Sequence, residues 1–334
     1  MLSYRAILKQ TWRFSWKNRA LWFLGFFASL VSFTVEARIM SRSLDQGAGI
    51  SSLNNLMMFI KTGIFSADAW KNVASLFRSN PGTMTIITIV FLLVVAISLF
   101  FLWLAVSSQI GIIKTVANSE KAGSNPDKKE KIKIKKILKS SQKKFWPVIL
   151  FNILISLIVN LIFLLISLLL VVVIIKSQVF ASIIYGLIFI IFIPASLFLS
   201  FIAKYAIAYV VLENKKIIPA LKNAWKLFCK NWLISIEMAI ILFFINFIAI
   251  VFFSLLSFII FTLFFGIALS ISIMTLPLFL FWTFIIVGFL LVMAIMILGG
   301  AWINVFQITS WVKLFTKLNS GSRSSKLERL FVEK

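Results

Sequence analysis

Apolar runs alternate with short basic segments along the chain, and this pattern predicts transmembrane helices. A helix needs about 20 predominantly apolar residues to cross the hydrocarbon core of a bilayer. Uncharged or nearly uncharged runs occupy 20–35, 83–113, 146–175, 179–212 and 232–312. The fourth run carries one charged residue, Lys204, and the fifth carries one, Glu237. We therefore expect helical spans in all of these runs.

The last run is long enough for more than one helix. Residues 238–312 are 75 consecutive residues without a charge, which two long helices or three short ones could fill. Two helices place every basic segment on one side of the membrane, with 27 of the 34 Lys and Arg residues. Because basic loops face the cytoplasm, this favours six transmembrane helices, cytoplasmic termini and a hairpin turn between Gly266 and Pro277. Pro277 suits the first turn of the helix that follows.

Composition supports a membrane protein and removes several kinds of chemistry. Apolar residues make up 61% of the 334 residues and charged residues 13%, against about 45–50% and 25% in soluble domains. The net charge of +24 lies between the apolar runs, which fits anionic lipid as a partner rather than nucleic acid. With no His and one Cys, Cys229, we expect no metal, no cofactor and no intramolecular disulfide.

The first run has a signal peptide as its alternative interpretation. Residues 35–37, Val-Glu-Ala, resemble a small-x-small cleavage site. Nineteen residues precede the run, however, and they carry Trp12, Trp16 and one copy of a repeat. We expect an uncleaved first helix, in a multi-pass protein of a bacterial cytoplasmic (inner) membrane.

A short motif recurs before the first, third and fifth runs. Residues 8–13 read Leu-Lys-Gln-Thr-Trp-Arg, and residues 221–226 read Leu-Lys-Asn-Ala-Trp-Lys. Residues 138–143, Leu-Lys-Ser-Ser-Gln-Lys, form a weaker middle copy. We therefore predict an all-α transmembrane bundle of three repeats, each an interfacial amphipathic helix followed by a transmembrane hairpin. The repeats and the basic flexible tail after them cover 1–132, 133–214, 215–318 and 319–334.

The motif segments have one basic and one apolar helical face, which is typical of helices lying in the membrane interface. In the first copy the apolar face contains Tyr4, Ile7, Leu8, Thr11 and Phe14, and in the third it contains Ile217, Leu221, Ala224 and Phe228. The candidate lipid- or partner-facing basic residues are Arg5, Lys9, Arg13, Lys17, Lys139, Lys143, Lys222, Lys226 and Lys230. The candidate headgroup-level anchors are Trp12, Trp16, Trp146, Trp225 and Trp232. These helices are either topology anchors or a docking surface.

Two loops carry further patterns. The outer loop at 36–82 has helical apolar spacing and is expected to contain short amphipathic helices. The inner loop at 114–145 carries 11 Lys residues; we expect a flexible stretch at 121–131 and the middle interfacial helix at 133–143.

Polar residues within the spans predict a layer near the cytoplasmic face. A charge inside a bilayer costs about 2.5–3.5 kcal/mol on insertion scales. By helical rise, Glu237 lies roughly 7–8 Å and Lys204 roughly 13 Å from the ends of their runs. The candidate polar layer consists of Lys204, Glu237, Gln109, Asn152, Asn304 and Gln307. It is either packing polarity or a path for a solute or ion.

An enzyme is not expected. The chain has no His, no acidic pair within a span and no phosphate-binding glycine loop. Cys229 is flanked by Phe228 and Lys230 and has no His partner.

The motif at 220–226, followed by Asn231 and Trp232, resembles the membrane domain attached to some glycerophosphodiester phosphodiesterases. The opening at 12–27 is similar to other bacterial polytopic membrane proteins. The resemblance implies a membrane-domain role only, because no phosphodiesterase domain or His follows. We therefore expect a non-catalytic, lipid-interacting or scaffolding protein whose basic cytoplasmic face docks anionic lipid or a partner. The alternative is a transporter or channel that uses the polar layer around Lys204 and Glu237.

Overall fold

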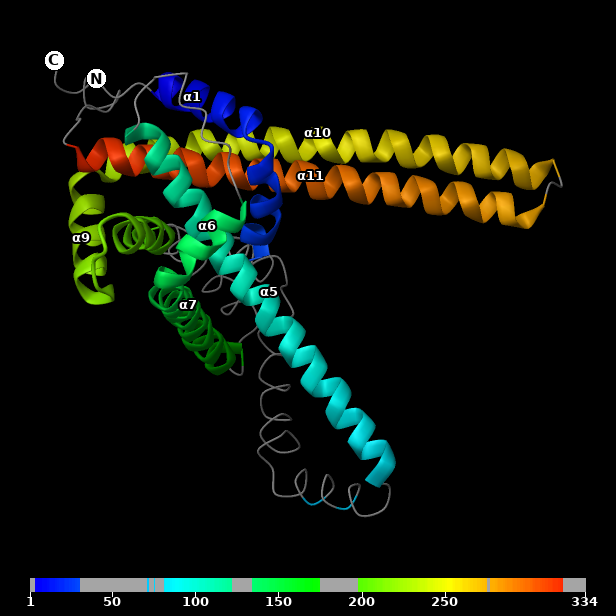
Figure 1. The fold of residues 1–334 in the computed structure, drawn as a ribbon, viewed down its shortest axis with the longest axis horizontal. Coiled ribbons are helices and arrows are strands. Elements are labelled where there is room, and N and C mark those ends of the chain that lie inside the picture. The colour runs from blue at the N-terminus through cyan, green and yellow to red at the C-terminus, as the bar shows by residue number, and fades with distance from the viewer. Residues whose placement is uncertain are drawn as a thin grey trace. The chain divides into compact units, whose positions relative to one another are not determined.

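The computed structural model describes residues 4–30, 71, 75, 81–121, 134–174, 198–274 and 277–320, and these are helical apart from short connections. The labelled helices are α1 (Tyr4–Lys17), α5 (Pro81–Lys121), α6 (Ile134–Ser141), α7 (Phe145–Ile174), α9 (Ile217–Lys230), α10 (Trp232–Ile273) and α11 (Leu278–Asn319) (Figure 1). A 3₁₀ turn, η1 (Gln142–Lys144), joins α6 to α7, and two further apolar helices cover Ala20–Leu30 and Phe198–Leu212. The predicted all-α class is confirmed over this part of the chain.

Among the described residues, three helices are long and apolar enough to cross a membrane: Gly82–Glu120, Trp232–Ile273 and Leu278–Asn319. The count of six spans stays a prediction, because the ends of the first run and most of the fourth lie outside the described residues. The expected helices of the outer loop also lie outside the described residues, apart from positions 71 and 75. So do the flexible inner stretch beyond Lys121 and the tail beyond Ser320.

The last apolar run folds as two helices of 42 residues each, α10 and α11, and not as three short ones. They lie side by side along their length (Figure 1). A Cβ added at Gly288 of α11 would lie 2.6 Å from Cβ of Phe264 in α10, so this glycine permits the close approach. α10 ends at Ile273 and α11 begins at Leu278, so the connection lies within the predicted interval, and Pro277 is the N-cap of α11 rather than part of its first turn.

The helix that contains the second predicted span continues beyond it. The sequence pattern ends it at Ile113, before Lys114, but α5 continues to Lys121. Its last turns are packed, with Ile113, Val116 and Ala117 buried. The charged Lys114 is accommodated because its Nζ donates a hydrogen bond to the carbonyl of Ser140, at 2.6 Å. The inner loop therefore begins eight residues later than predicted.

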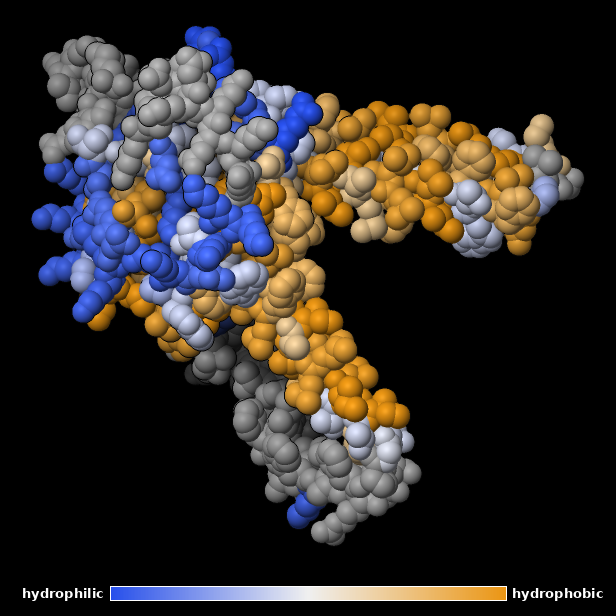
Figure 2. All heavy atoms as spheres, in the orientation of Figure 1, coloured by the Kyte–Doolittle hydropathy of each residue, from blue (hydrophilic) through white to orange (hydrophobic). Residues whose placement is uncertain are grey.

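The chain divides into two compact units. The first contains Met1–Ser32, Leu104–Val148 and Lys204–Lys334, and the second contains Phe33–Trp103 and Ile149–Ala203. The first unit has a core of fully buried side chains from several helices, including Leu21, Ile110, Tyr205, Met238 and Leu314. In this unit hydrophobic side chains cover the part of α10 and α11 that extends toward their connection, whereas hydrophilic ones gather over α6 and α9 (Figure 2). The division into three sequence repeats remains a prediction.

Candidate functional site

The motif helix α1 presents its basic residues on the exposed side. Tyr4, Ile7, Thr11 and Ser15 are buried. The exposed residues of α1 include the four predicted basic positions, Arg5, Lys9, Arg13 and Lys17. The helix contains no Asp or Glu, so every charge on its exposed face is positive.

The motif helices α9 and α6 are arranged in the same way. In α9 the buried stripe is Ala220, Ala224 and Phe228. Leu221, expected on the apolar face, is 38% exposed. The buried residues follow an i,i+4 spacing that begins at Ala220, so Leu221 lies at the edge of the buried face. In α6 Ser141 is buried. The basic residues Lys139, Lys143, Lys222, Lys226 and Lys230 are all exposed.

The first and third motif helices end in the same hydrogen-bonded connection to the next helix, which we call the elbow. The backbone N–H and side-chain Nδ2 of Asn18 both donate to the carbonyl of Phe14, at 3.1 and 2.9 Å. Asn231 makes the same two bonds to the carbonyl of Leu227, at 3.2 and 3.0 Å. Each asparagine thus satisfies a carbonyl at the end of the motif helix, just before the next helix begins. The elbows fall at equivalent positions of the two motif copies.

The five predicted tryptophan anchors are all about half-exposed or more, with Trp12 at 49% and Trp16 at 50%. Both also contact Trp302 of α11 edge-on, with ring centroids 4.8 and 6.1 Å apart. Edge-to-face aromatic pairs contribute about 0.5–1.5 kcal/mol beyond burial. The remaining anchors, Trp146, Trp225 and Trp232, carry the largest exposed fractions of the set. The tryptophans of α1 therefore fix α1 against α11 while keeping one edge exposed.

The predicted polar layer lies mostly in the first unit, where its members make packing contacts. Nδ2 of Asn304 donates to the carbonyl of Gly25, at 2.7 Å. Nζ of Lys204 lies 4.6 Å from the ring centroid of Trp311, in cation–π geometry. Gln109 and Gln307 are half-buried in the same unit, and Asn152, also half-buried, belongs to the second unit.

Glu237, the predicted acidic member of the layer, accepts a hydrogen bond from the hydroxyl of Tyr4. Burial, and then this bond, raise the pKa of Tyr4 well above its usual range. The hydroxyl therefore remains a proton donor at neutral pH. This contact joins the first turn of α1 to the beginning of α10.

A groove of about 880 Å³ opens beside the contact between Tyr4 and Glu237. Its polar rim is formed by Tyr4, Arg5, Lys9 and Glu237. Its apolar wall is formed by Leu8, Trp12, Ile240, Ile241, Ile245 and Phe306. The groove is thus amphipathic, with two exposed cations at one side of an isoleucine-rich wall.

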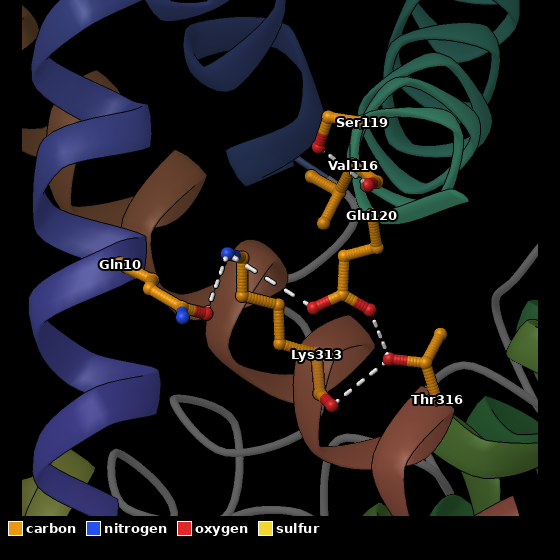
Figure 3. A network of polar contacts seen from close by, with 6 residues as sticks. All are labelled: Gln10, Val116, Ser119, Glu120, Lys313 and Thr316. Atoms are coloured by element: carbon orange, nitrogen blue, oxygen red, sulfur yellow. Dashed lines mark hydrogen bonds and ion pairs between the residues drawn. The ribbon is translucent and has the colours of Figure 1, made fainter. Parts of the chain in front are cut away.

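A second polar cluster joins the middle of α1 to the last turns of α5 and α11 (Figure 3). Nζ of Lys313 lies 4.0 Å from Oε1 of Glu120 and donates to Oε1 of Gln10 at 3.5 Å. The hydroxyl of Thr316 donates to the other carboxylate oxygen of Glu120. The Lys313 side chain is only 8% exposed, so this cluster compensates a nearly buried charge.

Sequence reasoning missed both the Lys313 cluster and the role of Tyr4. Lys313 ends the last uncharged run, and the charge pattern gave no sign that its side chain is nearly buried. The sequence offered one signal: Glu120 is one of only ten acidic residues in a chain of net charge +24. An acid this scarce is a good candidate for a specific cationic partner.

Several buried hydroxyl groups of the first unit have no hydrogen-bond partner among the described residues. They belong to Thr11, Ser15, Ser107, Ser108, Ser257, Thr309 and Ser310, and the indole N–H of Trp302 shares this property. They come from α1, α5, α10 and α11. A polar interior of this kind can bind water or a polar solute.

The described residues contain no group of three or more His, Cys, Asp or Glu side chains that could hold a metal ion. The arrangement supports binding of anionic or amphipathic molecules at its basic, tryptophan-bearing face. Comparisons with protein-family models, with curated proteins and with solved structures return no match to this chain.

Proposed function

We propose that this protein is a non-catalytic integral membrane protein whose basic cytoplasmic face docks anionic lipid. The observation that carries the proposal is the shared arrangement of α1 and α9, whose basic residues are exposed while a stripe of other residues is buried. In α6 the basic residues are likewise exposed, with Ser141 buried and Ile137 and Leu138 half-buried. A helix of this kind lies in the interface with its cations among phosphates. Each Lys or Arg near an anionic leaflet contributes about 1 kcal/mol.

The proposed setting is a bacterial cytoplasmic membrane, with six spans and both termini inside. Three repeats of interfacial helix plus hairpin would place all three cationic faces in the same leaflet. The matching elbows at Asn18 and Asn231 support this arrangement. On this topology the anionic inner leaflet meets three cationic helices at once.

The test is native mass spectrometry of the protein released from nanodiscs that contain equal amounts of phosphatidylglycerol and phosphatidylethanolamine. We expect the wild type to retain phosphatidylglycerol preferentially. Combined Lys222→Gln, Lys226→Gln and Lys230→Gln substitutions should reduce that preference. Equal retention of both lipids by the wild type would overturn the proposal. Co-purification of a stoichiometric protein from the native membrane, without lipid preference, would assign the basic face to a partner instead.

A solute or ion pathway through the polar layer is the second candidate, and the unpartnered buried hydroxyls favour it. In this case flux across vesicles should fall with Glu237→Gln and with Lys204→Met. Absence of flux in the folded wild type, assayed with Na⁺, K⁺ and H⁺, would argue against an ion pathway. The packing contacts of Lys204 and Asn304 fit a structural layer equally well.

A further inference from the structure

We propose that the groove between α1, α10 and α11 binds one anionic phospholipid molecule. Its phosphate would lie at Arg5 and Lys9, and one acyl chain would follow Ile241 and Ile245. This inference rests on the proposed function, because it assigns a single site within the cationic face. It differs in predicting one lipid held more tightly than those around it.

The charge of the groove selects an anion at its rim. Arg5 and Lys9 are one helical turn apart on α1, are both exposed and both line the groove. Residues at this spacing have Cβ atoms about 5–6 Å apart, so one phosphate can reach both side chains. Arg also binds phosphate oxygens through two parallel hydrogen bonds. The carboxylate of Glu237 is engaged by the hydroxyl of Tyr4, which reduces its repulsion of a bound phosphate.

The wall of the groove selects an amphipathic molecule rather than a free anion. Ile240, Ile241 and Ile245 lie on α10, and Phe306 closes the groove from α11. From Glu237 to Ile245 the helix rises about 12 Å, so the apolar wall is long enough for much of an acyl chain. The volume of about 880 Å³ is within the range of roughly 300–1,000 Å³ typical of ligand sites. A free phosphate would leave this wall unfilled.

The tryptophans place the groove at headgroup level. Trp12 lines the groove and contacts Trp302. Trp302 is itself buried, but the half-exposed Trp12 and Trp16 lie against it. The exposed Trp282 lies 20 residues before Trp302 in α11. This separation is about 30 Å of helix, which matches the thickness of the hydrocarbon core. Tryptophan prefers the two boundaries of that core. With Trp12 at one boundary, Arg5 and Lys9 lie within two turns of it on α1 and can reach lipid phosphates.

The experiment compares two double variants of equal charge on the same helix. Arg5→Gln with Lys9→Gln removes the cations of the groove, and Arg13→Gln with Lys17→Gln removes two exposed cations that do not line it. Each protein is released from mixed phosphatidylglycerol and phosphatidylethanolamine nanodiscs, and retained lipids are counted by native mass spectrometry as collision energy rises. We expect the first variant to lose the last-released phosphatidylglycerol, at least a tenfold loss of occupancy, and the second to keep it.

A second pair of variants leaves charge unchanged. Ile245→Trp fills the groove and should also remove the last-released lipid. Ile248→Trp, at a 65% exposed position of α10 outside the groove, should not. Thermal unfolding in the same nanodiscs confirms that each variant is folded. If the Arg5 and Lys9 variant does not fold, the Ile245 and Ile248 pair decides the question alone.

The outcomes separate this inference from the proposed function. Equal losses in both double variants, with no effect of Ile245→Trp, would overturn the single site and leave diffuse docking intact. No preference for phosphatidylglycerol in the wild type would overturn both. Binding of inorganic phosphate in detergent that depends on Arg5 and Lys9, without a retained lipid, would identify an anion site and overturn the lipid assignment.

Discussion

The two halves of α11 have nearly opposite surroundings, although they belong to one uninterrupted helix. From 278 to 300 the described side chains are mostly exposed, and the buried positions there are Gly288 and Gly299. From 301 to 318 most side chains are buried. The first half contains one polar side chain, Thr283, whereas the second contains Asn304, Thr309, Ser310, Lys313 and Thr316, among others. The packed half is the polar half.

This contrast teaches which residues join helices in a membrane. Lipid tails are as apolar as Leu or Ile, so apolar side chains gain little by leaving lipid for another helix. Small residues and hydrogen-bonding side chains supply the association instead. Hydropathy therefore indicates where α11 can span, and its polar residues indicate where it packs.

The largest expected loss of stability comes from replacing Gly25 with a larger residue, because Gly25 packs against the buried half of α11. A Cβ at this position would collide with the carbonyl oxygen of Ala301 and with Cγ2 of Val305. We expect Gly25→Val to destabilise the fold by about 3 kcal/mol, at the upper end for overpacking. The control is Gly300→Val on α11, where a Cβ meets nothing within 4 Å. Thermal unfolding in nanodiscs should separate the two, and equal midpoints would contradict the close crossing.

The next effect concerns the cluster around Lys313. Glu120→Gln removes the charge that compensates a side chain only 8% exposed. A fully buried broken pair costs about 3–5 kcal/mol, but Glu120 is 22% exposed, so we expect about 2 kcal/mol. Adding Lys313→Met should recover much of that loss, because no unpaired charge is left. Additive losses in this double-mutant cycle would show that the two side chains do not interact.

A smaller effect distinguishes the two halves directly. Asn304→Leu removes the hydrogen bond to Gly25 and should cost about 1 kcal/mol, within the range for interhelical bonds in membranes. Thr283→Val on the exposed half removes only a bond to the carbonyl of Phe279 in its own helix. We expect Thr283→Val to be neutral within measurement error. A larger loss of stability for Thr283→Val than for Asn304→Leu would contradict the conclusion that polar side chains of α11 join it to other helices.

The smallest effect tests the buried hydroxyls. Ser310 is buried and has no hydrogen-bond partner among the described residues. Replacing an unpartnered polar group with an apolar one is close to neutral or stabilising. We expect Ser310→Ala to leave the unfolding midpoint unchanged or slightly higher. A loss of more than about 1 kcal/mol would mean that the hydroxyl has a partner, such as an ordered water.

Charge distribution made much of the fold predictable. The long uncharged run at 238–312 could not reveal its number of helices by itself, but the basic segments on either side required an even number. The hairpin of α10 and α11 follows from that requirement. The helical motif segments were predictable because their basic and apolar residues alternate at helical spacing.

Charge also caused the errors. The inner loop was expected to begin at Lys114, directly after the second apolar run, because a charge usually marks the membrane boundary. The helix continues, since Lys114 finds an acceptor in the carbonyl of Ser140. Leu221 was placed on the apolar face by its type, whereas the small Ala220 and Ala224 form the buried stripe. Contacts between distant segments, such as Tyr4 with Glu237, leave no local pattern that a single sequence can show.

The separation of Trp282 and Trp302 has a consequence for where such a protein can reside. Membranes differ by a few ångströms in thickness, and mismatch with a helix costs fractions of a kcal/mol per ångström. The exposed Trp282 marks one level of α11, and the half-exposed Trp12 and Trp16, which lie against the buried Trp302, mark the other. A helix whose two aromatic levels are about 30 Å apart prefers a bilayer of that thickness. Trp302 also contacts Trp12 of α1. A thicker bilayer would therefore strain the packing of α1 against α11 as well as the span itself. Bilayer thickness would then act as a sorting signal for this chain.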